Sequence, residues 1–321
     1  MKATSLRQIL VPIDFSPASL ASLRFAKLLA ARFGAKLHLV HVIAPAPIYG
    51  LGRGVLLLPF PDKAMVQAAR QRLQDLISQL SLPPRSTQCT LRVGQASTQI
   101  NEAAEKHRSD LIAIATGGTT RLKRALLGST TERVVRQAPC PVLVVREGKH
   151  QSTRKSARKG RTALKFRKIL VPIDFPECSR LGLEYALGFA REFRAGLVLF
   201  HSIFVHAYML GDQHAAREVP GLNATRRDRA KDKMEALQRS LSRKGREVES
   251  EIAFGSPLKR INDYAVKEDI DLIITSTHGR TGLRRVFASS TAERIVRDGT
   301  CPVLVVPNRP ARKKDKRKLS I

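Results

Sequence analysis

Tryptophan and paired cysteines are what this sequence most plainly lacks. Its 321 residues include no tryptophan, 5% aromatic residues and four cysteines, none of them in a Cys-x-x-Cys pair or at a metal-ligand spacing. We therefore expect neither a zinc nor a redox centre, and no base-stacking motif. Cys140 and Cys301 each precede Pro-Val-Leu-Val-Val, and we predict that both are small, buried apolar residues.

Long apolar segments are also missing. No run approaches the roughly 18 apolar residues that a membrane span requires, and the N-terminal segment MKATSLRQILVPIDF has no signal-peptide pattern. These absences predict a cytoplasmic protein with no membrane partner. An apolar share of 43% and the length of 321 residues indicate a globular protein of two domains, each of about 150 residues.

Acidic residues are scarce, with 27 against 57 basic ones, which leaves a net charge of +30. Segments 147–167 and 307–321 together carry +13, residues 1–146 carry another +13, and residues 168–306 carry +4. Basic runs without an apolar pattern usually mark solvated segments, but they can also bind phosphate backbones in a salt-dependent way. Non-specific nucleic-acid or polyanion binding is therefore one functional hypothesis.

The chain is one unit written twice. The segment Ile-Leu-Val-Pro-Ile-Asp-Phe at 9–15 returns at 169–175, and Cys-Pro-Val-Leu-Val-Val at 140–145 returns at 301–306. Asp110-Leu-Ile returns as Asp271-Leu-Ile, so the offset stays at 160 or 161 residues and predicts a tandem domain duplication. The predicted parts are domain 1 at 1–146, a basic linker at 147–166, domain 2 at 167–307 and a basic tail at 308–321.

Within one unit, near-continuous apolar runs alternate with helical apolar stripes. The predicted strands of the first unit are 8–13, 36–43, 88–93, 110–116 and 141–145. The predicted helices are 17–33, with Ser16 as N-cap and Gly34 as its end, 63–80, 97–107 and 129–137. This alternation predicts an α/β fold, a doubly wound parallel sheet in each unit, with ligands bound beyond the carboxyl ends of the strands.

Asp14 follows the first predicted strand, where a ligand would lie. It is either a turn residue before the Ser16 cap or part of a binding pocket. Its repeat, Asp174, keeps the carboxylate although the cap position becomes Pro176. Retention of the acid without the cap slightly favours the pocket.

The stretch ATGGTTRLKRALLGSTTER, residues 115–133, also has two interpretations. Gly118 and Gly128 would let backbone amides approach an anion and adopt positive φ, and a helix that begins near Ser129 would add free amides. The other interpretation is a capping box, Ser129-x-x-Glu132, which needs no phosphate. The second unit has Ser290-x-x-Glu293 at the same place.

Together, the Ile-Leu-Val-Pro-Ile-Asp strand, the Gly-x9-Gly-Ser loop and the closing Pro-Val-Leu-Val-Val strand resemble the universal stress protein family. The resemblance covers roughly residues 6–146 and 166–307. It implies a Rossmann-like, five-stranded sheet ordered 3-2-1-4-5 in each domain. It further implies that the two repeats pair through their last strands as a pseudo-dimer, with a further homodimer left open. Some members of the family bind ATP through Gly-x2-Gly-x9-Gly-Ser/Thr.

Carried over to this sequence, the resemblance implies a nucleotide site in domain 1. Asp14 matches the aspartate near adenine and ribose, Val42 matches the residue beside the base, and Gly128 closes the phosphate loop. Ala115 departs from the pattern, because a glycine belongs there. The full set of candidate residues is Pro12, Ile13, Asp14, Val42, Ala115, Gly118, Gly128, Ser129, Thr130 and Thr131.

Domain 2 departs further from the same pattern. Ser276 and Ser289 replace the first and third glycines, and Ser202 stands where Val42 stands in domain 1. A side chain at Ser289 would intrude where backbone must approach phosphate, and it would disfavour positive φ. The weaker candidates of this domain are Asp174, Gly279, Ser289, Ser290 and Thr291.

No catalytic constellation is visible: there is no Ser-His-Asp order, no carboxylate pair and no Walker lysine. We therefore expect a regulatory protein of stress response or signalling, not a dedicated enzyme, although slow hydrolysis stays open. Its expected ligand is ATP, with Mg²⁺ as a candidate companion, bound in domain 1. The alternatives are a scaffold without nucleotide and a nucleic-acid or polyanion binder that uses the linker and tail.

Overall fold

The computed structural model describes ten segments of the chain. They are residues 6–44, 47–49, 55–57, 61–117, 127–146, 164–175, 179–204, 220–242, 247–276 and 291–307.

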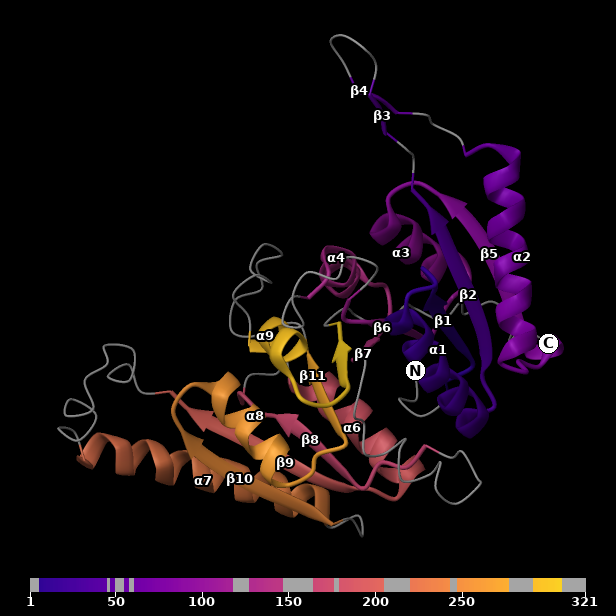
Figure 1. Ribbon diagram of the computed structural model, residues 1–321. Helices are drawn as coiled ribbons and strands as arrows, with labels where there is room; N and C mark the ends of the chain where they lie inside the picture. Colours follow the sequence, from indigo (N-terminus) through magenta and orange to yellow (C-terminus); the bar gives the residue numbers. More distant parts are fainter. Residues whose placement is uncertain are drawn as a thin grey trace, which may run out of the picture.

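A single ten-stranded sheet runs through both units (Figure 1). In domain 1 the strands are β1 (Gln8–Pro12), β2 (Lys36–Ile43), β5 (Thr87–Val93), β6 (Leu111–Ala115) and β7 (Val142–Val145). In domain 2 they are β8 (Lys168–Pro172), β9 (Gly196–Ile203), β10 (Val248–Phe254), β11 (Leu272–Ser276) and β12 (Val303–Val306). The order is β10-β9-β8-β11-β12-β7-β6-β1-β2-β5. Each half therefore has the order 3-2-1-4-5, and the predicted fold class is confirmed.

Helices cover both faces of this sheet. In domain 1 they are α1 (Pro17–Phe33), α2 (Lys63–Gln79), α3 (Ala96–Lys106) and α4 (Ser129–Gln137). In domain 2 they are α6 (Ser179–Phe193), α7 (Pro220–Ser242), α8 (Pro257–Lys267) and α9 (Thr291–Asp298). Residues of α1, α2, α6 and α7 share one apolar core, and residues of α3, α4, α8 and α9 share the other. Each core therefore continues across both domains.

The two domains meet strand to strand. β7 pairs antiparallel with β12, with Leu143 opposite Leu304. Both side chains are 1% exposed, and burial of one leucine contributes roughly 1.5–3 kcal/mol. On one face, aromatic rings pack across the seam: the Phe33 ring centroid, at the end of α1, lies 5.7 Å from that of Phe189 and 5.9 Å from that of Phe193, both on α6.

A cation also crosses this seam. Arg146, which follows β7, donates through Nη2 to the carbonyl oxygens of Val296 and Arg297 at the end of α9, the first at 3.0 Å. Those carbonyls are among the groups that a helix leaves unpaired at its carboxyl end. The last residue of domain 1 therefore caps the last helix of domain 2.

The ends of α1 follow the predicted chemistry. Ser16 Oγ accepts a hydrogen bond from the Ser19 amide at 3.1 Å, Pro17 is the first helical residue, and Gly34 ends the helix with φ of 66°. Three short elements were not predicted. They are the antiparallel pair β3 (Pro47–Tyr49) and β4 (Val55–Leu57), and a 3₁₀ turn at Pro84–Ser86.

The aspartates that mark the repeat have a structural role. Asp110 Oδ2 accepts hydrogen bonds from the amides of Arg7 and Gln8, at 2.8 and 3.0 Å. Asp271 Oδ2 accepts from the amides of Arg167 and Lys168, at 2.7 and 3.3 Å. Each aspartate thus fixes the beginning of the first strand of its domain, at the edge away from the predicted site.

The cysteine prediction is confirmed at both repeat positions, because Cys140 and Cys301 are each 7% exposed within the apolar core of one face. Cys89 is exposed, and Cys178 lies outside the described residues. None of the helices in the described part of the chain is long and apolar enough to cross a membrane.

A buried histidine distinguishes the core of domain 1. The His38 side chain is fully buried on β2, its Nε2 lies 2.7 Å from Thr90 Oγ1, and its ring lies 4.1 Å from the His107 ring. Burial, followed by the nearby His107 and Arg92, lowers the pKa of His38 to about 4. The neutral imidazole is therefore the form that folding stabilises.

We predict a pH dependence of stability from this histidine. Its pKa is about 4 in the folded chain and near 6.5 in the unfolded chain, so the unfolded state takes up the proton first as the pH falls. Stability is fully present above pH 6.5 and is lost between pH 6.5 and 4, by about 2–3 kcal/mol. Urea unfolding followed by circular dichroism across this range measures the loss.

The matched control is His38→Val, because Val198 occupies the same position in domain 2. Carboxyl groups elsewhere titrate in both proteins, so the quantity to compare is the difference between wild type and variant. A difference that stays constant from pH 7 to pH 4 would contradict the assignment.

Candidate functional site

The candidate residues of domain 1 lie at the carboxyl edge of the sheet. The parallel register places Pro12 of β1 opposite Val40 of β2, so Asp14 and Val42 lie level with each other just beyond β1. β6 is the other neighbour of β1, and it ends at Ala115 on the same edge. The topology therefore brings these residues together, as the sequence predicted.

The side chains at this edge are not equally available to a ligand. Ile13 and Ala115 are buried, with 2% and 7% exposed, whereas Pro12 and Val42 are half-buried and Asp14 is exposed. Ile13 also donates its amide to the Val40 carbonyl at 2.8 Å. Ile13 and Ala115 would thus contribute backbone and shape, and Asp14 would contribute the charge.

Asp14 is both a turn residue and an ionised edge residue. Its Oδ1 accepts hydrogen bonds from the Ser16 amide at 2.9 Å and from the Ser16 hydroxyl at 2.6 Å. Partial desolvation raises the pKa of Asp14, but these bonds from Ser16 outweigh it, so the pKa lies below its ordinary value. Asp14 is therefore a carboxylate at neutral pH, which is a hydrogen-bond acceptor for hydroxyl groups.

The beginning of α4 is tied to the end of β6 by two hydrogen bonds. The Gly128 amide donates to the Thr116 carbonyl at 2.7 Å, and Thr131 Oγ1 donates to the Ala115 carbonyl at 2.7 Å. Thr131 is 4% exposed, whereas Ser129 is exposed and Thr130 is half-buried. Thr131 therefore positions the helix, and the other two lie at its accessible amino end.

The predicted capping box is wrong in domain 1. α4 begins at Ser129 itself, the N-cap position is held by Gly128, and no side chain caps the helix. Glu132 instead forms an ion pair with Arg136, one turn along the same helix. The amides of the first turn are thus not satisfied by a side-chain cap, which leaves them available to an anion.

One of the two reasons predicted for Gly128, the third glycine of the pattern, is also wrong. Gly128 has φ of −61°, a value that any residue adopts, so positive φ does not explain it. Space does: a Cβ at Gly128 would lie 3.3 Å from the Thr116 carbonyl oxygen, which is tighter than an ordinary contact. The lack of a side chain at Gly128 therefore eases the close approach of α4 to the end of β6.

Several candidates fall outside the described residues. They are Gly118 of domain 1 and Gly279, Ser289 and Ser290 of domain 2. Of the remaining domain 2 candidates, Asp174 is exposed after β8, and Thr291 is the exposed first residue of α9.

The described edge of domain 2 differs from that of domain 1 in chemistry. Ser202 Oγ donates to the Gly255 carbonyl at 3.0 Å, so this hydroxyl is engaged at the end of β10. Ala292 stands where Thr131 stands in domain 1, and it has no hydroxyl to tie its helix to β11. The positioning bond of α4 is therefore not repeated in α9.

Sequence reasoning missed three residues beside Asp14. Phe15 packs against His41, with ring centroids 4.8 Å apart, and Arg72 of α2 lies 4.0 Å from the Phe15 centroid. In domain 2 their counterparts are Phe175, His201 and Lys233. Their recurrence at the repeat offset of 160 or 161 residues is the feature of the sequence that could have identified them.

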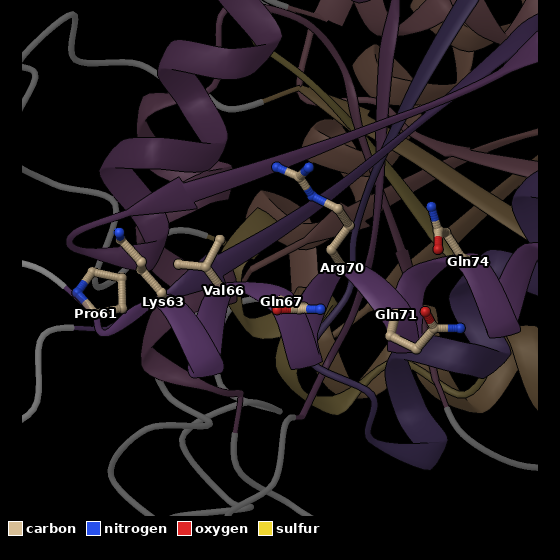
Figure 2. A pocket seen from close by; sticks show the side chains of 7 residues that line it. All are labelled: Pro61, Lys63, Val66, Gln67, Arg70, Gln71 and Gln74. Carbon is tan, nitrogen blue, oxygen red and sulfur yellow. The ribbon is translucent and has the colours of Figure 1, made fainter.

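A cavity of about 490 Å³ lies elsewhere in domain 1, along α2 (Figure 2). It is lined by Pro61, Lys63, Val66, Gln67, Arg70, Gln71 and Gln74. None of these residues belongs to the carboxyl edge around Asp14, so the cavity and the candidate site are separate.

The fold and its carboxyl edge define a tandem α/β protein built from two doubly wound domains. A model of the Universal stress protein family matches residues 5–146 and 165–307. The chain belongs to this family, and the resemblance seen in the sequence is confirmed.

Relatives match the chain one domain at a time. Universal stress protein MJ0531 of Methanocaldococcus jannaschii is 27% identical over 141 residues, which are 44% of this chain and 82% of that protein. Universal stress protein G of Shigella flexneri is 30% identical over 142 residues, 44% of this chain and 99% of that protein.

A solved structure matches both domains together. The universal stress protein from Archaeoglobus fulgidus DSM 4304 covers 95% of this chain and 97% of its own, with a TM-score of 0.66 and 19% identity. At that identity the likeness concerns the fold alone. The two-domain architecture is thus found in another member of the family.

We predict that Thr131→Val destabilises domain 1 by about 1–2 kcal/mol, because the isosteric side chain fits but leaves the buried Ala115 carbonyl without the Thr131 hydroxyl. Urea unfolding at pH 7 measures the change. Thr131→Ser is the control, since it keeps the donor. Equal stability of Thr131→Val and wild type would show that the bond does not hold α4.

Proposed function

We propose that this protein binds ATP at the carboxyl edge of domain 1 and acts as a stress-response or signalling regulator. The proposal rests on two complementary groups that lie at the carboxyl edge of the sheet. An exposed, ionised Asp14 lies after β1, and the uncapped amino end of α4 lies after β6. A carboxylate suits sugar hydroxyls, and free helix amides suit phosphate.

The residues of this edge fit such a ligand by shape as well. Gly128 keeps α4 close to the Thr116 carbonyl, and a side chain there would be crowded. Ser129 and Thr130 offer hydroxyls at the accessible first turn of the helix. Val42 offers a half-buried apolar surface level with Asp14. Family membership supports the same assignment.

Domain 2 is proposed to be the weaker or inactive site. It keeps the carboxylate at Asp174 but has serine where Gly128 stands, and it has lost the hydroxyl of Thr131. Domain 1 is therefore expected to bind ATP more tightly than domain 2, with about one ATP bound per chain.

A regulatory role is proposed over an enzymatic one because of how the edge residues are engaged. The lowered pKa of Asp14 makes it a weak base, and its Oδ1 is already occupied by Ser16. His41 is committed through Nδ1 to the Ile13 carbonyl at 2.6 Å. With Asp14 a weak base that already accepts hydrogen bonds from Ser16, ATP turnover is expected to be slow or absent.

We predict that Gly128→Ser weakens ATP binding about tenfold. The crowding of its Cβ against the Thr116 carbonyl and the new helix cap act in opposite directions on stability, so urea unfolding accompanies the binding measurement. Serine at the N-cap accepts a hydrogen bond from the amides of the first turn, so it would compete with phosphate while capping the helix. Calorimetric titration of the full chain with ATP measures the affinity, and mass spectrometry of nucleotide released on heat denaturation identifies any ligand that copurifies.

The matched control is Gly117→Ser in the same loop, where an added Cβ meets nothing within 4 Å. Its ATP affinity should equal that of wild type. Absence of binding at millimolar ATP would reject the proposal in favour of a scaffold without nucleotide. Equal affinities of the two serine variants would reject the role given to Gly128.

A further inference from the structure

The residue after Asp14 has an unusual backbone. Phe15 has φ of 62°, and its counterpart Phe175 has φ of 45°. The left-handed region is disfavoured for bulky side chains, and it persists only where surrounding contacts hold it. The same strained aromatic residue thus follows the edge carboxylate in both domains.

The Phe15 ring is held between two partners from different elements. The His41 ring, on β2, lies 4.8 Å away and is tilted by 52°, and the Arg72 guanidinium, on α2, lies 4.0 Å from the ring centroid. Both distances are within the range of favourable aromatic and cation–π contacts. The turn is therefore clamped from the sheet side and from the helix side.

Domain 2 has the same arrangement with a weaker cation–π contact. Phe175 lies 4.6 Å from the His201 ring, and Lys233 Nζ lies 5.4 Å from the Phe175 centroid. Lysine replaces arginine at a longer distance, so the clamp is looser in the domain whose other edge residues have also changed.

The histidine also fixes the residue before Asp14. His41 Nδ1 lies 2.6 Å from the Ile13 carbonyl oxygen, and His201 Nδ1 lies 2.7 Å from the Ile173 carbonyl oxygen. A carbonyl only accepts, so Nδ1 carries the hydrogen in both cases. The backbone is thus held on one side of Asp14 by the histidine bond and on the other by the Phe15 clamp.

We infer that His41, Phe15 and Arg72 form an aromatic clamp that positions the Asp14 carboxylate for the ribose hydroxyls of the bound nucleotide. The three are positioning residues, since they act through Asp14, and the inference rests on the function proposed above. Phe15 is half-buried and packs against the apolar core as well as between His41 and Arg72.

Phe15→Leu tests the clamp, because it removes the aromatic face and keeps every charge. ATP affinity of the full chain should fall about three- to tenfold. Phe15→Tyr keeps the ring and should retain wild-type affinity. Phe33→Leu is the matched control, since Phe33 is half-buried at the opposite end of α1 and packs on Phe189.

A double-mutant cycle with Asp14→Asn separates positioning from direct contact. If the clamp acts through Asp14, Phe15→Leu has no further effect once Asp14→Asn is present. The preference of wild type for ATP over 2′,3′-dideoxy-ATP should likewise disappear in Phe15→Leu. An equal loss of affinity with and without Asp14→Asn would overturn the inference, because Phe15 would then contact the nucleotide itself.

A readout without ligand keeps this inference separate from the proposed function. In wild type, the bonds from Ser16 hold the pKa of Asp14 below its ordinary value, and the clamp keeps that turn in place. Carbon-detected NMR titration should show a higher Asp14 pKa in Phe15→Leu and an unchanged one in Phe33→Leu. An unchanged pKa in both variants overturns the clamp, whereas a failure of wild type to bind ATP contradicts the proposed function alone.

Discussion

The antiparallel pairing of β7 with β12 is the contact on which the rest of the architecture depends. A five-stranded sheet that ended at β7 would expose a row of unpaired backbone groups on a strand whose residues are about 1% exposed in the full chain. Pairing satisfies both edges at once and joins the apolar cores on each face into two continuous layers. The two domains are therefore joined by more than the linker, since each half completes the sheet of the other.

This seam also connects the two carboxyl edges. α4 and α9 each begin at a carboxyl edge, and Arg146 of domain 1 caps the carboxyl end of α9 beside the seam. Burial, and then the charge of Glu132 on α4, raise the pKa of Glu293 on α9, so the two helices lie close enough to influence each other electrostatically.

Much of this could be predicted from the sequence, because the signals are local. Continuous apolar runs placed β1, β2 and β6 within one or two residues, and Ser16 and Gly34 marked the ends of α1. What depends on three-dimensional neighbours could not be predicted. The strain at Phe15 is invisible because phenylalanine has no preference for positive φ, and only the distant Arg72 and His41 make it tolerable. Positive φ was wrongly predicted for Gly128, since its φ is ordinary and the Thr116 carbonyl is what limits the space for a side chain there.

The two repeats share the shape of the turn after their first strand and differ in the chemistry of the helix that begins opposite it. Both domains keep the aspartate, the strained phenylalanine and the histidine that fix the end of the first strand. They differ at Gly128 and Thr131, which set the beginning of the helix opposite that strand, and which domain 2 replaces with Ser289 and Ala292. The strand end belongs to the fold of each domain, because it packs against the sheet and α2 or α7. The beginnings of α4 and α9 lie outside the sheet, so one of them could change without loss of the shared sheet. Under the proposed function, this gives one chain two similar edges with unequal affinity.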